Sequence, residues 1–138
     1  MLILALRTDK PEAELYLLES LNSDAIVSSE VWQAHRTLAE TLHIRIKKLL
    51  SEQRKTVHDL TGIIVYAGPG SFTGLRIGAT VANAQAASLN IPAVGSTGDY
   101  WIKLGLELLS LAADQKTTVA TIVIPQYGSE PHITTPKK

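Results

Sequence analysis

The sequence predicts a single α/β domain in which helices cover a mixed sheet of about five strands. The first observation is a set of short apolar or β-branched runs, typical of buried strands, at residues 2–6, 15–18, 25–29, 61–67 and 93–95. The second is a set of helical stretches at residues 34–52, 73–89 and 100–113. A strand meander followed by strand–helix–strand crossovers produces a mixed sheet with helices packed against it. The 138 residues are enough to bury the core of one such domain.

The first three strands follow one another across two short turns. Asp9, Lys10 and Pro11 separate the first run from the second, and residues 21–24 (Leu-Asn-Ser-Asp) separate the second from the third. Polar residues and proline at these points are typical of turns. Because the connections are short, we expect an antiparallel meander.

The central helices and the central strand have clearer patterns. Residues 34–52 carry an apolar stripe at helical spacing, which consists of Leu38, Leu42, Ile46, Leu49 and Leu50. Residues 61–67 are apolar enough for a strand in the middle of a sheet. The helix at residues 73–89 ends before Pro92, because proline disfavours helical geometry at Ile91.

The C-terminal part continues with a third helix and a tail. Leu104, Leu108 and Leu111 lie on one side of the helix at residues 100–113. Residues 117–124 are β-branched, which favours an edge strand or an extended tail equally. We therefore divide the chain into a first lobe, a helix and edge strand that complete the same domain, and an extended tail, at residues 1–97, 98–124 and 125–138.

The most informative motif joins the fourth strand to the second helix. It begins with a tight structural turn made of Gly68, Pro69, Gly70 and Ser71. The glycines allow the backbone to turn sharply and to approach another group closely. One interpretation is a phosphate cradle at a helix N-terminus. The Gly-Lys-Ser/Thr of a P-loop is missing, however, because Leu75 and Arg76 follow Gly74.

A row of small residues runs along the helix that follows the turn. At a spacing of four, it consists of Gly74, Gly78, Ala82 and Ala86. Each glycine inside a helix costs about 1 kcal/mol relative to alanine, so the row predicts close packing against another backbone. The facing helix is that of residues 34–52, a second copy of the chain or a different protein. We expect Gly78→Leu to abolish pairing and to leave the fold largely intact.

Other polar residues have simple interpretations. Ser71, together with Thr73, is placed to cap the second helix. Arg76 occupies the first turn, an unfavourable position for a cation, so we expect it to pair with a carboxylate of this chain or of a partner. His35 and His43 are eight residues apart, which does not suit joint metal binding. We therefore expect no catalytic residue, no metal and no cofactor.

Composition argues against several function classes. The 13 basic and 13 acidic residues cancel, whereas direct binding of nucleic acid requires a concentrated basic surface. The chain has no cysteine, which excludes disulfides and thiolate catalysis and fits a reducing cytoplasm. No apolar run approaches the roughly 20 residues that cross a bilayer. We therefore expect a cytoplasmic protein without a direct nucleic-acid or membrane partner.

Several segments in order resemble the TsaB family, also called YeaZ. They are residues 3–6 (Ile-Leu-Ala-Leu), His35 at the start of an amphipathic helix, and residues 68–78 (Gly-Pro-Gly-Ser-Phe-Thr-Gly-Leu-Arg-Ile-Gly). Residues 125–127 and 130–134 resemble the Pro-x-Tyr and Glu-Pro-x-Ile-Thr tail of many family members. Family members have two actin-like lobes, and the resemblance covers the first lobe and the tail. Nearly all of the second lobe is therefore expected to be missing.

The resemblance implies a ribonuclease H-like, actin-like fold and a role in making threonylcarbamoyladenosine in tRNA. It implies a non-catalytic scaffold that pairs with a TsaD-like catalytic subunit, which a TsaE-like ATPase joins. Family members pair through the first two helices of the first lobe. The implied partner interface on this chain consists of His35, Leu38, Leu42, Gly74, Leu75, Arg76, Gly78, Ala82 and Ala86.

One departure from the family pattern argues against nucleotide hydrolysis. Actin-like nucleotide binders carry an Asp, often as Asp-Thr, after the first strand, where this chain has Arg7 and Thr8. An arginine has no lone pair to offer to magnesium. Two alternatives stay open. One is a nucleotide-binding ATPase or phosphotransferase fragment that uses the turn at residues 68–74, and the other is a homodimeric scaffold without a TsaD-like partner.

Overall fold

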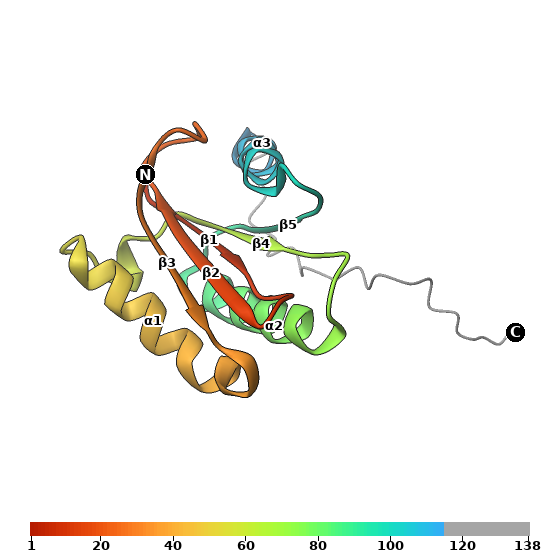
Figure 1. Cartoon of the computed structure of the whole chain (residues 1–138). Coiled ribbons are helices and arrows are strands. Elements are labelled where there is room, and N and C mark those ends of the chain that lie inside the picture. The colour runs from red at the N-terminus through yellow and green to blue at the C-terminus, as the bar shows by residue number, and fades with distance from the viewer. Residues whose placement is uncertain (115–138) are drawn as a thin grey trace, which may run out of the picture.

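A computed structural model describes residues 1–114 of the chain as a five-stranded sheet with helices on both faces (Figure 1). The elements in chain order are β1 (Ile3–Arg7), β2 (Glu12–Leu18), β3 (Ile26–Gln33), the 3-10 turn His35–Thr37, α1 (Leu38–Glu52), the 3-10 turn Val57–Asp59, β4 (Gly62–Tyr66), α2 (Phe72–Leu89), β5 (Ala93–Ser96) and α3 (Trp101–Asp114). The predicted α/β class with a mixed sheet of five strands is confirmed. The predictions for residues 117–124 and 125–138 lie outside the described residues.

The sheet has the strand order β3-β2-β1-β4-β5. β1 pairs antiparallel with β2, and β2 pairs antiparallel with β3, as expected for a meander. β1 pairs in parallel with β4, placing Ile3 opposite Gly62, and β4 pairs in parallel with β5, placing Ile63 opposite Ala93. After the meander, α1 carries the chain from β3 at one edge of the sheet back to β4, which lies beside β1, and α2 then carries it outward from β4 to β5.

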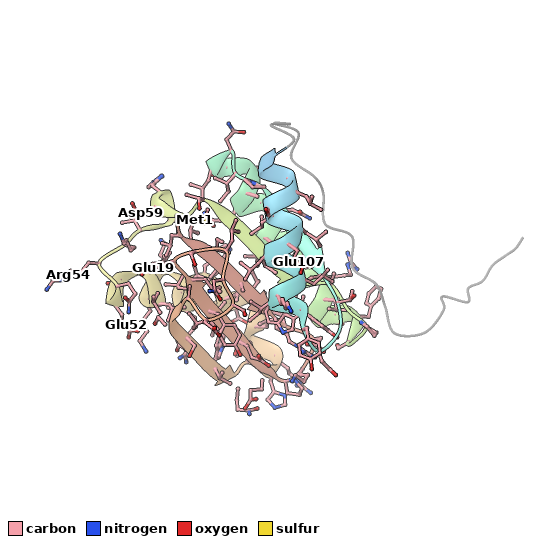
Figure 2. The ribbon with its side chains drawn as sticks, turned by 90° about the horizontal axis from the view of Figure 1, so that it is seen from above. Met1, Glu19, Glu52, Arg54, Asp59 and Glu107 are labelled. Carbon is pink, nitrogen blue, oxygen red and sulfur yellow. The ribbon has the colours of Figure 1, made fainter. Side chains whose placement is uncertain are left out.

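The two faces of the sheet pack against different helices. α1 and α2 lie side by side on one face, and α3 lies on the other (Figure 1). Because side chains alternate along a strand, Leu4 and Leu6 of β1 pack on the α1 and α2 side, whereas Ile3 and Ala5 pack on the α3 side. Seen from above, α3 crosses the sheet and leaves the edge strand β3 largely uncovered (Figure 2).

Two element boundaries differ from the sequence prediction by four residues, and β2 begins at Glu12 instead of residue 15. β3 continues to Gln33 instead of ending at residue 29, because Trp32 is buried under α1 and its Nε1 donates a 3.1 Å hydrogen bond to Thr41 Oγ1. α1 begins at Leu38 instead of residue 34, because His35 has a φ of 44° and opens a separate 3-10 turn. Both differences depend on contacts between segments, which local propensity does not report.

Candidate partner interface

The predicted row of small residues on α2 faces the chain's own sheet. Ala82 and Ala86 are buried in the core that α1 and α2 share with the strands. A Cβ added to Gly74 would overlap the main-chain oxygen of Thr8, and one added to Gly78 would overlap Thr8 Oγ1. The Thr8 hydroxyl also donates a 2.7 Å hydrogen bond to the carbonyl oxygen of Gly74. The row therefore packs against the end of β1.

These contacts correct two expectations about α2. The backbone that approaches the row is Thr8 of the same chain, and neither α1 nor a partner helix occupies that position. A leucine at Gly78 would collide with Thr8, so Gly78→Leu would damage the fold itself and is not a clean test of pairing.

The other residues of the implied interface are also mostly internal. Leu38 and Leu42 belong to the core between α1 and the sheet, and Leu75 is 1% exposed on the α3 side. His35 and Arg76 are the members of the predicted set that are exposed. The surface that α1 and α2 present to solvent is therefore made of different residues from those that the sequence indicated.

One local expectation at the start of α2 is corrected, and for Arg76 the structure leaves only a carboxylate outside the described residues. Ser71 occupies the N-cap position, but its side chain makes no capping hydrogen bond, and the helix already includes Thr73. Arg76 forms no ion pair with any of residues 1–114, and its guanidinium lies 5.4 Å from the centre of the Phe72 ring. A carboxylate partner for Arg76 is not found within the described part of the chain.

The outward face of α2 is small and almost uncharged. Opposite the buried row, its exposed residues are Phe72, Thr73, Arg76, Thr80, Ala84, Ala87 and Ser88. Arg76 is the single charged residue in the 18 residues of α2, all of which the structure describes. The exposed residues of α1, in contrast, include Glu40, Lys47 and Lys48. A solvent-facing helix normally carries charged residues on its outer face, so the outward face of α2 has the composition of a contact surface.

The predicted structural turn closes over the end of the sheet. Gly68 has a φ of 117°, a conformation that glycine adopts without strain. The Tyr66 hydroxyl donates a 2.8 Å hydrogen bond to the Pro69 carbonyl oxygen, and a Cβ on Gly70 would overlap the side chain of Asp9. The space beside the turn is thus filled by the chain's own residues at the end of β1.

Asp9 is the residue at this turn that the sequence analysis missed. Arg7 Nε lies 2.7 Å from Asp9 Oδ1, and the Arg7 guanidinium stacks over the Tyr66 ring at 3.8 Å. Burial alone would lower the pKa of Arg7, but the hydrogen bond and the charge of Asp9 outweigh burial and raise it. Burial raises the pKa of Tyr66, and the charge of Arg7 opposes that effect. The sequence signal for this ion pair was the presence of opposite charges two residues apart, at Arg7 and Asp9.

The described residues contain neither a cluster suited to a metal ion nor a membrane-spanning helix. Within residues 1–114, no group of three or more histidine, aspartate or glutamate side chains is placed to hold a metal ion. In the same part of the chain, none of the helices has the length and apolar character required to span a membrane.

The strand order, the parallel crossovers and the opposed position of α3 define the class of protein. This arrangement of strands and helices is that of a ribonuclease H-like, actin-like α/β lobe. A solved structure, YeaZ from Pseudomonas aeruginosa, superposes with a TM-score of 0.62 at 27% identity, over 70% of this chain and 43% of that chain. The predicted fold class is confirmed.

Similarity in sequence narrows the class to a family. The TsaB protein of tRNA threonylcarbamoyladenosine biosynthesis from Bacillus subtilis is 33% identical over 92 residues, which are 67% of this chain and 39% of that protein. An uncharacterized protein of Mycobacterium tuberculosis is 40% identical over 60 residues, 44% of this chain and 28% of its own length. The family model described as TsaD, tRNA N6-adenosine threonylcarbamoyltransferase, matches residues 30–97. These similarities show that the chain belongs to the TsaB/YeaZ family, and it spans less than half the length of these relatives.

Proposed function

We propose that this chain takes part in making threonylcarbamoyladenosine in tRNA as a non-catalytic scaffold subunit of a cytoplasmic complex. Its partner in this proposal is a TsaD-like catalytic subunit, and a TsaE-like ATPase joins the assembled pair. The similarity to the Bacillus subtilis protein of tRNA threonylcarbamoyladenosine biosynthesis supports this process. The chain itself contributes a binding surface and makes no direct contact with nucleic acid.

The outward face of α2 carries the proposal. Thr80, Ala84 and Ala87 follow one another at helical spacing on the side opposite Gly78 and Ala82. Small side chains let the backbone of a second helix approach closely and bury Cα surface. Ile44 of the neighbouring helix α1 is 65% exposed and extends the apolar character of this side of the molecule. A partner helix laid on α2 would therefore remove apolar surface from water without burying many charges.

Arg76 could fix the orientation of a partner helix on α2. It lies in the first turn of α2 with no carboxylate from residues 1–114 beside it. An interface that places a partner carboxylate there would satisfy both charges and select the orientation of the partner.

The contacts at the end of β1 support a role without nucleotide chemistry. In this fold the carboxyl ends of the parallel strands are where ligands bind. Here Asp9 pairs with Arg7 and packs against Gly70, and Thr8 packs against Gly74. A nucleotide phosphate would have to displace a charge pair and separate the turn from β1.

The test is light scattering of the full chain mixed with the TsaD-like protein of the same organism. We expect a heterodimer, and we expect Ala84→Glu to weaken it by about tenfold or more, because an unpaired carboxylate in an interface is costly. Ala84 is exposed, so the fold should change by less than about 0.5 kcal/mol. The matched control is Lys103→Glu, which adds a carboxylate on α3 at the opposite face of the sheet and should leave pairing unchanged.

Other outcomes would favour the alternatives. If Ala84→Glu and Lys103→Glu weaken the heterodimer equally, or if neither variant weakens it, the outward face of α2 is not the interface. Self-association without the heterodimer would favour a symmetric homodimer. Measurable binding of ATP with magnesium to the isolated chain by calorimetry would favour a nucleotide-binding fragment.

A further inference from the structure

The strand β3 presents a long backbone edge on one side of the sheet. It is the outermost strand on that side, and the described residues place no further strand beside it (Figure 1). Ile26, Val27 and Val31 of this strand are 41%, 37% and 49% exposed. An edge strand leaves a row of N–H and C=O groups that can pair with another strand. β3 is therefore a surface on which a sheet can be extended.

Edge strands normally carry features that prevent such pairing, and β3 has few of them. The usual features are lysine, proline and β-bulges. The eight residues of β3, all of which the structure describes, include no lysine, arginine or proline. One bulge leaves Val27 without a partner on β2, but Ser28–Gln33 pair with β2 in regular register. The edge is therefore open along most of its length.

The one charge on β3 is already paired within the chain. Among the eight described residues of the strand, only Glu30 is charged, and its carboxylate forms ion pairs with Arg45 and Lys48 of α1. A basic strand from a different protein would find this carboxylate occupied. An uncharged segment needs no such contact. The exposed residues of β3 itself include Val27 and Ser29, so that a second copy of this strand suits the edge.

Symmetry restricts how two copies of β3 can meet. An antiparallel pair has a two-fold axis, which matches the same surface on both chains. Because side chains alternate along a strand, an axis normal to the sheet must set one residue opposite its own copy. The two registers with the longest overlap are centred on Ser29, which pairs residues 26–32, and on Glu30, which pairs residues 27–33. The second register sets two carboxylates opposite each other, which is destabilising.

We propose that two copies of this chain pair antiparallel through β3, with Ser29 opposite Ser29 at the two-fold axis. This register places Val27 of one copy opposite Val31 of the other, so that exposed apolar surface leaves water. Glu30 lies opposite Ser28, and each carboxylate keeps its ion pairs within its own chain. The two five-stranded sheets become one. The contact lies apart from α2, which packs beside β1, β4 and β5.

A single introduced cysteine reports this register, because the chain has no native cysteine. Opposite Cα atoms of antiparallel strands are about 4.5–5.5 Å apart, which suits a disulfide between two copies of Ser29→Cys. We expect this variant of the full chain to form disulfide-linked dimers about tenfold or more faster than Ser88→Cys under mild oxidation, since pairing raises the local concentration of the thiols. Ser88 is an exposed serine of α2 and provides the matched control.

Light scattering of the full chain tests the same surface without a crosslink. Val31→Lys places on the edge the residue that natural edge strands use to prevent pairing. We expect it to raise the dissociation constant of the dimer by about tenfold or more. Val31 is exposed, so the urea midpoint should be nearly unchanged. Ile44→Lys, at an exposed position of α1, is the matched control and should leave self-association unchanged.

The outcomes separate this interface from the others. Faster crosslinking at Ser29, together with a weaker dimer in Val31→Lys, supports the proposal. A chain that is monomeric at every concentration, or equal crosslinking at Ser29 and Ser88, would overturn it. Loss of self-association in Ile44→Lys but not in Val31→Lys would assign pairing to the helical face and overturn it as well. The heterodimer with the TsaD-like protein is tested separately, because Ala84→Glu changes a different surface.

Discussion

Gly78→Ala tests whether the Thr8 hydroxyl is what requires glycine in the middle of α2. Thr8 is 1% exposed, and its hydroxyl donates a 2.7 Å hydrogen bond to the Gly74 carbonyl oxygen. A methyl group on Gly78 would overlap that hydroxyl. Thr8 must then rotate and give up its hydrogen bond, so that the substitution changes two contacts at once.

The expected magnitude follows from two opposing effects. Leaving the buried hydroxyl unpaired costs about 1–3 kcal/mol, whereas alanine is better than glycine in a helix by about 1 kcal/mol. We expect a net loss of about 1 kcal/mol from these two numbers. In a Thr8→Ala background the obstacle is gone, because the next atom of residue 8 is its Cβ at 3.4 Å, an ordinary contact. The same Gly78→Ala change should then stabilise the protein by about 1 kcal/mol.

The assay is urea unfolding of the wild type, both single variants and the double variant, compared at unchanged m-value. Gly74→Ala is the matched control, because its methyl group would overlap the main-chain oxygen of Thr8, which Thr8→Ala does not remove. Gly74→Ala should therefore destabilise both backgrounds by about 1–3 kcal/mol. If Gly78→Ala changes stability equally in both backgrounds, within about 0.5 kcal/mol, the hydroxyl is not the obstacle and the reasoning fails.

Two further predictions concern single side chains. Burial, then the 2.6 Å hydrogen bond from the Tyr16 hydroxyl to Glu14 Oε1, raises the pKa of Tyr16 from 10.0 to about 12. Because the folded state favours the protonated phenol, this contribution is complete below pH 10 and is lost as the pH rises to about 12. Tyr16→Phe should flatten that decline in unfolding free energy, and an unchanged slope would refute the assignment. Ser71→Ala should cost less than about 0.5 kcal/mol in the same unfolding assay, well below the roughly 1 kcal/mol of a bonded N-cap. A larger loss would mean that the hydroxyl makes a cap in solution.

The elements with a strong local pattern were predictable from the sequence. Leu38 and Leu42 repeat at helical spacing, and both are buried under the sheet. The run at residues 61–67 contains no charged residue, and β4 is covered on both faces. Local periodicity sufficed in these cases because it arises from the same burial that forms the core.

The neighbours of α2 were not predictable in the same way. The spacing of Gly74 and Gly78 indicates that a backbone comes close, but it does not say which one. Thr8 lies 66 residues before Gly74 in the sequence. Alanine, glycine and threonine also occur on both sides of α2, so the buried side has no apolar stripe to mark it. The Arg7–Asp9 pair was missed for a related reason, since it forms only where the chain leaves β1.

The small residues on both sides make α2 unusually thin in cross-section. Gly78 contributes no side chain to its contact with Thr8, and on the outer side Thr80 and Ala84 have short side chains that can take up little displacement. A partner protein that pressed on the outer side of α2 would act on a helix whose inner side contacts the end of β1 directly. Any shift of the helix axis must therefore pass to Thr8 and on to the Arg7–Asp9 pair beside it, so that the outer surface and the strand end are mechanically linked across a single backbone.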